Sequence, residues 1–146
     1  MSLVLQDLGN GSSRVWVGHG RKYRVTFNIQ GTAGTCSCQQ VTGFQVVLFE
    51  NETSYKYRKF DKKDKVDQEF FKLAKDWINF RTKHYGWNKR FEAMITTRET
   101  VAESLLKESG FIHLGSYMGS HHLRVHIWSK AVSFSRRNEP KTRNSS

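Results

Sequence analysis

Alternation of apolar and polar side chains predicts a β-hairpin near the N-terminus. Residues 14–29 alternate in this way around a Gly18-His19-Gly20 turn. Residues two apart in a strand share a face, so the second strand has an apolar face (Tyr23, Val25, Phe27, Ile29) and a polar, partly basic face (Lys22, Arg24, Thr26, Asn28). We expect the apolar face to pack and the other to stay polar.

The next segments predict a loop and two strands. Residues 31–43 are small and polar, which is typical of a loop, whereas residues 44–50 are β-branched and aromatic, which favours a strand. After a turn at residues 51–53, residues 54–60 are expected to form an edge or half-buried strand.

Two helices follow, each with an end signal. Between Asp64 and Tyr85 the apolar residues fall at helical spacing, Asp64 is placed to cap the first turn, and Gly86 to end the helix. Residues 90–96 predict a strand. The capping-box pattern of residues 96–99 then opens a second helix that ends at Gly110, with these residues inward: Val101, Ala102, Leu105 and Leu106.

A second hairpin completes the predicted fold, with strands at residues 111–117 and 121–128. In its last strand we expect one set of side chains to face the core (His121, Leu123, Val125, Ile127) and the other to form a candidate ligand patch (His122, Arg124, His126, Trp128). The alternative is that a helix or a partner subunit covers that second face. The fold class is α+β, a mixed, largely antiparallel sheet with two main helices.

The composition predicts a single basic domain. With 146 residues the chain has room for one domain, which we place at residues 1–132, followed by a disordered basic tail at residues 133–146. Lys and Arg number 24 against 13 Asp and Glu, a formal net charge of +11 that favours polyanions as partners. Charge spread evenly for solvation is the alternative.

Several patterns argue for a cytoplasmic protein. The first nine residues lack the basic start and apolar stretch of a signal peptide, and no run approaches the roughly 20 apolar residues of a membrane span. Cys36 and Cys38 are too close for an unstrained disulfide, so we expect reduced thiols. A zinc site would need a second ligand pair from the six histidines, none at a recognised spacing, so no metal is expected.

A basic run interleaved with aromatic residues is the main candidate site. Its cations suit phosphates and its rings (Tyr55, Tyr57, Phe60) suit base stacking. The candidate residues for binding nucleic acid or another anion are Lys56, Arg58, Lys59, Lys62, Lys63 and Lys65, with Lys22 and Arg24 of the first hairpin and Arg136 and Arg137 of the tail. Lysines near a helix N-terminus are unfavourable, because that end of the helix dipole is positive. A bound phosphate would resolve this electrostatic conflict. The alternative is a solvated helix entry with core aromatics.

From about residue 54 to 130, the order of elements and the stretch Ala102–Phe111, AESLLKESGF, resemble the C-terminal half of the GNAT acyltransferase fold. The resemblance implies an acyl-CoA whose pyrophosphate rests on a glycine-rich loop at a helix N-terminus. The matching residues 58–65 contain no glycine, the position of the general-acid tyrosine holds Leu106, and that of a frequent asparagine holds Glu99. We therefore expect a retained fold with no catalytic residues and no cofactor.

The leading hypothesis is a non-catalytic protein that binds DNA or RNA. Small basic GNAT-like chains of this kind resemble the internal virion proteins of short-tailed bacteriophages, which would place the protein in a virion or in the host cytoplasm. One alternative is an N-acetyltransferase with an atypical phosphate loop, which would use acetyl-CoA, with Tyr117 as a displaced acid. Another is an inhibitor or adaptor that docks on an acidic host protein. Oligomerisation is compatible with each.

Overall fold

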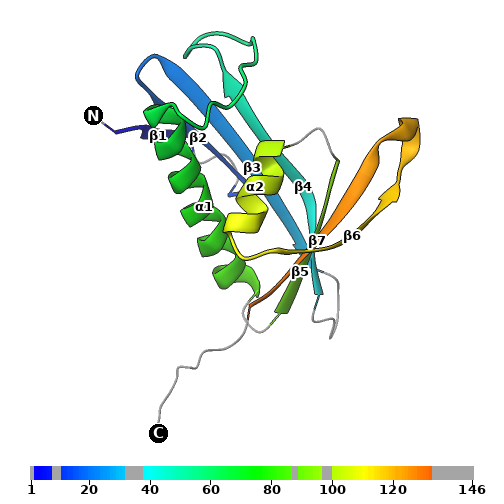
Figure 1. The fold of residues 1–146 in the computed structure, drawn as a ribbon. Helices are drawn as coiled ribbons and strands as arrows, with labels where there is room; N and C mark the ends of the chain where they lie inside the picture. Colours follow the sequence, from blue (N-terminus) through cyan, green and yellow to red (C-terminus); the bar gives the residue numbers. More distant parts are fainter. Residues whose placement is uncertain (1, 8–10, 32–37, 87–88, 97–99, 133–146) are drawn as a thin grey trace, which may run out of the picture.

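The computed structural model of the chain describes residues 2–7, 11–31, 38–86, 89–96 and 100–132. It contains one seven-stranded sheet in the order β1-β2-β3-β4-β5-β7-β6, with two α-helices (Figure 1). The strands are β1 (Val4–Asp7), β2 (Ser13–Gly18), β3 (Arg21–Gly31), β4 (Cys38–Phe49), β5 (Lys89–Thr96), β6 (Ile112–Met118) and β7 (Arg124–Val132). The helices are α1 (Lys65–Gly86) and α2 (Thr100–Glu108), with a short 3₁₀ turn, η1 (Ser120–His122). Among the described residues, no helix has the length and apolarity to cross a membrane.

The sheet splits between β4 and β5. These two strands pair in parallel only over Cys38–Val41 and Arg90–Ala93, whereas every other neighbouring pair of strands is antiparallel. Beyond the pairing, the strands continue to Phe49 and Thr96 and diverge, so that the β6–β7 hairpin leans away from β3 and β4 (Figure 1). The predicted α+β class with a mixed, largely antiparallel sheet is confirmed.

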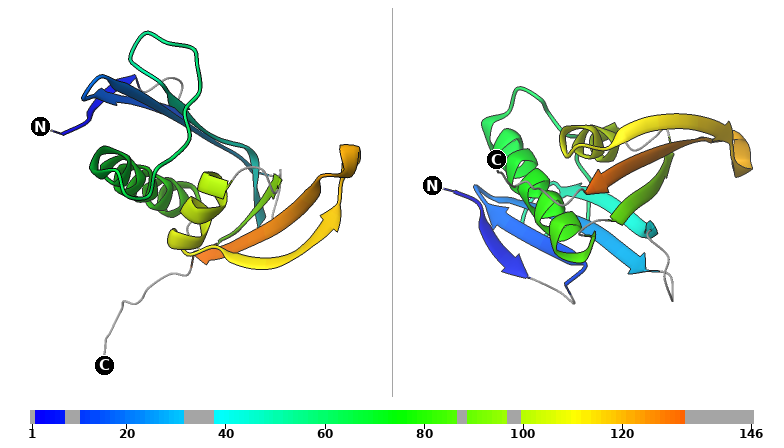
Figure 2. Two further views of the ribbon diagram at one scale, coloured as in Figure 1. Left: turned by 45° about the horizontal axis from the view of Figure 1, so that its top comes forward. Right: turned by 90° about the horizontal axis from the view of Figure 1, so that it is seen from below.

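Both helices cover the same face of the sheet, and the core lies between them and the strands (Figure 2). On β3 the predicted apolar face is buried: Tyr23, Val25 and Phe27 are inaccessible to solvent. Tyr23 stacks on Phe70 of α1 with ring centroids 4.5 Å apart, and Trp16 of β2 meets Phe70 edge-on at 6.0 Å. The predicted one-sided packing of the first hairpin is therefore confirmed.

The end signals predicted for the helices are confirmed where the structure describes them. Asp64 caps α1, because its Oδ1 accepts the backbone N–H groups of Val66 at 2.8 Å and Asp67 at 3.0 Å. Gly110 follows α2 with φ +93°, a left-handed conformation that glycine adopts without strain. The capping-box residues 97–99, including Glu99, lie outside the described residues.

Two strand predictions in the first half are wrong. Strand β4 begins at Cys38, inside the segment expected to be a loop, because pairing with the full length of β3 continues to Gln39. Residues 54–60 form no strand; they make one isolated bridge, between Tyr57 and Phe49. The residues at the start of β4 are too small and polar for their pattern to predict a strand. Pairing with β3 determines their conformation instead.

The predicted faces of the last strand need correction. His121 and His122 have φ values of 58° and 59° and belong to η1, so β7 begins only at Arg124. Trp128 is 8% exposed and belongs to the core, whereas Ile127 does not, the reverse of the expected orientation. Periodicity shows which residues share a face, but not which face the helices cover.

Packing around Phe70 predicts a large stability effect. Phe70→Ala removes a fully buried ring that contacts both Tyr23 and Trp16, and should lower the free energy of unfolding by about 3–5 kcal/mol. Phe80→Ala, at an exposed position of the same helix, is the matched control and should cost less than about 1 kcal/mol. Urea unfolding followed by far-UV circular dichroism measures both. Equal losses would show that Phe70 does not hold α1 to the sheet.

Candidate functional site

A buried carboxylate joins three elements at the N-terminus of α1. Asp67, which is inaccessible to solvent, accepts hydrogen bonds on Oδ1 from the Tyr23 hydroxyl at 2.5 Å and from Arg58 Nη2 at 2.6 Å. Its Oδ2 accepts from Arg58 Nη1 at 3.0 Å and from the Asp61 backbone N–H at 2.9 Å. Asp67 thereby ties β3 and the segment before α1 to the helix itself.

A second ion pair lies beside the first. Arg21, at the start of β3, donates to Asp64 Oδ1 at 2.6 Å, and this bond holds the pKa of Asp64 well below its usual range. Burial raises the pKa of Asp67, but hydrogen bonds from Arg58 and Tyr23 outweigh it, so the net direction is downward. Burial, with the bond to Asp67, raises the pKa of Tyr23 to about 12.

The segment before α1, residues 54–60, runs along the end of β4. The backbone N–H of Arg58 donates to the Leu48 carbonyl at 2.7 Å, and that of Glu50 donates to the Lys56 carbonyl at 2.9 Å. Together with the bridge between Tyr57 and Phe49, these bonds fix the segment to the strand edge that β5 has left. We call residues 54–60 the edge segment.

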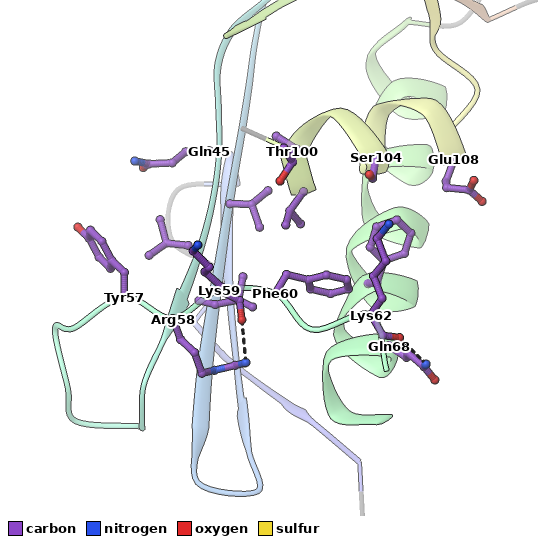
Figure 3. A pocket seen from close by; sticks show the side chains of 16 residues that line it. Gln45, Tyr57, Arg58, Lys59, Phe60, Lys62, Gln68, Thr100, Ser104 and Glu108 are labelled. Atoms are coloured by element: carbon purple, nitrogen blue, oxygen red, sulfur yellow. Dashed lines mark hydrogen bonds between the residues drawn. The ribbon is translucent and has the colours of Figure 1, made fainter. Parts of the chain in front are cut away.

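A cleft of about 970 Å³ lies where β4 and β5 diverge, bounded by β4, the edge segment, α1 and α2 (Figure 3). Apolar side chains contribute most of its lining, and polar and charged side chains from all four elements join them. The apolar lining includes Val46, Leu48, Phe60, Phe71 and Val101; the polar lining includes Lys59, Lys62, Gln68, Ser104 and Glu108. A cleft of this size and composition suits an elongated, partly apolar ligand.

The face of the sheet opposite the helices carries a different feature. Lys22 Nζ lies 4.5 Å from the ring centroid of Phe49 and 5.4 Å from that of Tyr55, and Arg24 lies 5.5 Å from Phe49. Tyr57 meets Phe49 edge-on at 5.8 Å. Tyr55 and Tyr57 are 86% and 74% exposed, whereas Phe49 is buried beneath its neighbours; we call these five residues the outer-face cluster.

The structure therefore brings two sequence-distant groups of predicted site residues together. Lys22 and Arg24 lie beside the edge segment, whose Lys56 and Lys59 are exposed. Arg58 is different, because its guanidinium turns inward to Asp67. Lys62, Lys63 and Lys65 are exposed near the start of α1, and Arg136 and Arg137 lie outside the described residues.

The predicted histidine patch is brought together only in part. His126 and Trp128 surround His113 of β6, with His113 Nε2 2.9 Å from His126 Nδ1 and the His113 and Trp128 rings 5.1 Å apart. Arg124 donates to the Ser116 hydroxyl at 3.0 Å, whereas His122 lies in η1. Sequence reasoning missed His113, because only the pairing of β6 with β7 places it opposite Trp128.

Within the described residues, no group of three or more His, Cys, Asp or Glu side chains is arranged to hold a metal. Cys36 and the side chain of Cys38 lie outside the described part of the chain. The absence of a metal site therefore stays a prediction of the sequence.

Comparison with solved structures supports the resemblance noted in the sequence. No protein-family model matches the chain, and no curated protein matches it significantly. A GNAT-family acetyltransferase from Streptococcus pneumoniae superposes with a TM-score of 0.50 at 14% identity, covering 85% of this chain and 69% of that one. The fold is GNAT-like. A second GNAT-family acetyltransferase, from Bacillus anthracis, gives a TM-score of 0.46 at 9% identity, covering 82% of this chain and 66% of that one.

The likeness extends further along the chain than the sequence indicated. The residues that carry the sequence resemblance lie between about 54 and 130, whereas the superposition covers 85% of the chain and so includes strands of the N-terminal half. The chain spans about two thirds of the length of these two structures. At such low identity the likeness establishes the fold and leaves the activity open.

The residues at the start of α1 do not fit the pyrophosphate of the acyl-CoA that a GNAT-like fold implies. The helix N–H groups of Val66 and Asp67 already donate to Asp64, and the Asp61 N–H donates to the buried Asp67 carboxylate. A pyrophosphate would compete with these carboxylates for the same donors and meet their charge. Leu106, at the position of the general acid, is buried in the core.

Removing the buried charge should destabilise the protein and alter its response to acid. Asp67→Asn leaves the Arg58 guanidinium without its counter-charge, which should cost about 3–5 kcal/mol. In the wild type, the lowered pKa of Asp67 contributes stability that is present above the ordinary aspartate pKa of 3.8 and is lost as the pH falls below it. The variant should lose less stability on acidification between pH 5 and pH 2.

Urea titrations across that pH range measure the difference, with Asp76→Asn as the matched control because Asp76 is an exposed aspartate of the same helix. The control should keep the wild-type acid response. An Asp67→Asn profile parallel to that of the wild type would contradict the assigned role of the carboxylate.

Proposed function

We propose that the protein is a non-catalytic nucleic-acid-binding protein with a GNAT-like fold, and that the outer-face cluster is its binding surface. The observation that supports this most is the exposure of Tyr55 and Tyr57 beside Lys22 and Arg24. Exposed rings stack on bases, and neighbouring cations contact the phosphates. The net charge of +11 adds a long-range attraction for a polyanion.

The arrangement favours unpaired bases over a duplex. Ring stacking requires the face of a base, which is available in a single strand and hidden inside a double helix. Tyr55 and Tyr57 are two residues apart on the edge segment, and Lys56 and Lys59 are exposed on the same segment. With Lys22 and Arg24 beside them, the two rings would offer a single strand stacking surfaces and cations on one face of the sheet.

Mutations should distinguish the contribution of ring stacking to binding from the contribution of charge. Tyr55→Ala and Tyr57→Ala should each weaken binding of a single-stranded oligonucleotide by about 1–3 kcal/mol while leaving its salt dependence unchanged. Lys22→Gln with Arg24→Gln should weaken binding and reduce the dependence of affinity on salt. Fluorescence anisotropy at several salt concentrations, with single- and double-stranded DNA and RNA, measures both effects.

Two controls sharpen this experiment. Phe80→Ala removes an exposed ring from α1, and Lys72→Gln removes an exposed charge from the same helix. Both should bind nearly as the wild type does. If the controls weaken binding as much as the cluster variants, the charge of the whole chain and not the outer-face cluster is responsible.

The cleft favours one other candidate, an N-acetyltransferase. The cleft has a volume of about 970 Å³ and lies between β4 and α2, which suits an elongated ligand. The carboxylates at the start of α1 and the leucine at position 106 argue against an acyl-CoA there. Association with packaged DNA in a virion stays a prediction of the sequence.

Thermal unfolding decides between the two. Acetyl-CoA at high concentration should leave the melting temperature unchanged, because a ligand stabilises a protein only when it binds the folded state. Single-stranded oligonucleotide at low salt should raise it. A rise with acetyl-CoA that CoA lacking the acetyl group does not produce would favour the transferase.

A further inference from the structure

Lys130 of β7 is a partly buried lysine that forms no ion pair within the described part of the chain. Its Nζ donates to Asn79 Oδ1 at 2.8 Å and to Thr82 Oγ1 at 3.1 Å, both on α1. Neither acceptor carries a charge. A charge that is removed from water ordinarily has a counter-charge beside it, and this lysine has neutral oxygens instead.

The acceptors around Lys130 match a neutral amine. An uncharged lysine has two N–H groups and one lone pair, whereas the ammonium form has three N–H groups and no lone pair. Asn79 and Thr82 accept two hydrogen bonds, and the Thr82 hydroxyl is free to accept because its own hydrogen is donated to the Asn79 carbonyl at 3.1 Å. The neutral form is therefore satisfied and keeps its lone pair.

The surroundings of Lys130 also favour that form. Burial, and then the positive charge of Lys83, lower the pKa of Lys130 from 10.5 to about 8. Gly110 and Phe111, between α2 and β6, lie beside its side chain and carry no charge. The Phe111 ring favours the ammonium form, but its centroid lies 5.9 Å from Nζ, near the limit of about 6 Å for a cation–π contact.

Gly110 leaves a path to the amine. A Cβ built on Gly110 would lie 3.5 Å from Lys130 Cε and 3.9 Å from Nζ, and Gly110 itself is exposed. Any other residue would place a side chain there. A reactant can therefore approach Nζ over the backbone of Gly110.

We propose that Lys130 is a nucleophilic amine that accepts an acyl group from acyl phosphates. A lysine becomes a nucleophile near neutral pH when it is desolvated or lies beside another cation, and Lys130 meets both conditions. An anionic donor is favoured over a neutral one, because Lys83 is exposed and its charge reaches the amine.

The reaction balances without a further reactant. The lone pair of Nζ attacks the carbonyl carbon and forms the amide bond, while the bond from that carbon to the phosphate oxygen breaks. One amine proton passes to solvent, and the products are an acylated lysine and inorganic phosphate.

The first test is acetylation of the full chain by acetyl phosphate, with the rate at each lysine measured by peptide mass spectrometry. At about pH 7.5 exposed amines are almost wholly protonated, so Lys130 should react about tenfold faster than Lys72 and Lys107, two exposed lysines. In concentrated urea this rate ratio should fall to about one, because unfolding removes the burial. A ratio of one in the folded protein, or a high ratio that persists in urea, overturns the proposal.

The second test restores the missing counter-charge. Asn79→Asp keeps the shape of the side chain and places a carboxylate where the amide oxygen lies 2.8 Å from Nζ. The ion pair should favour the ammonium form and reduce the rate at Lys130 to that of the exposed lysines, with no fall in melting temperature. Gln68→Glu makes the same chemical change at an exposed position of α1 and should keep the wild-type ratio. If Asn79→Asp keeps the high ratio, or Gln68→Glu loses it, the assigned environment is wrong.

The class of donor has its own test. The ester N-hydroxysuccinimidyl acetate transfers the same acetyl group but carries no charge. The rate ratio should be higher with acetyl phosphate, because the charge of Lys83 attracts only the phosphate donor. Equal ratios with the two reagents would overturn the assignment to acyl phosphates. None of these outcomes depends on nucleic-acid binding, so the two proposals stand or fail separately.

Discussion

The architecture at the start of α1 depends on one buried charge. Asp67 sits without solvent contact between a strand, an irregular segment and a helix, and its two oxygens accept hydrogen bonds from Tyr23 of the strand and from Arg58 and Asp61 of the irregular segment. An unpaired carboxylate in that position would be strongly disfavoured, so Arg58 and Tyr23 must be in place when it is buried. The conformation of the edge segment follows from that requirement.

The same carboxylates also bear on the pyrophosphate site that the resemblance in the sequence implies. The sheet splits between β4 and β5 and leaves a cleft, yet Asp64 already accepts the helix N–H groups of Val66 and Asp67, and Asp67 accepts the N–H of Asp61 just before the helix. N–H donors at a helix N-terminus ordinarily attract anions, but here carboxylates of the chain itself accept their hydrogen bonds. Lys22 and Arg24, the cations of the proposed binding surface, lie over Phe49 on the opposite face of the sheet.

The sequence was most informative where a local signal decides the structure. The alternation around Tyr23 and the cap at Asp64 were readable because each depends on residues close in the chain. Long-range strand pairing could not be predicted from local sequence. Strand β4 extends to Cys38 because β3 continues beside it, and His113 lies opposite Trp128 only because β6 pairs with β7. The basic run around Lys56 was recognisable, but nothing local showed that Arg58 would turn inward.

That inward turn has a consequence for recognition. Arg58 and Tyr57 are consecutive residues, one bound to Asp67 and the other an exposed ring that meets Phe49 edge-on. Any ligand that stacks on these rings meets a segment whose backbone was already ordered when the protein folded. The loss of conformational entropy that usually opposes binding to a loop has then largely occurred beforehand, and more of the contact energy remains as affinity.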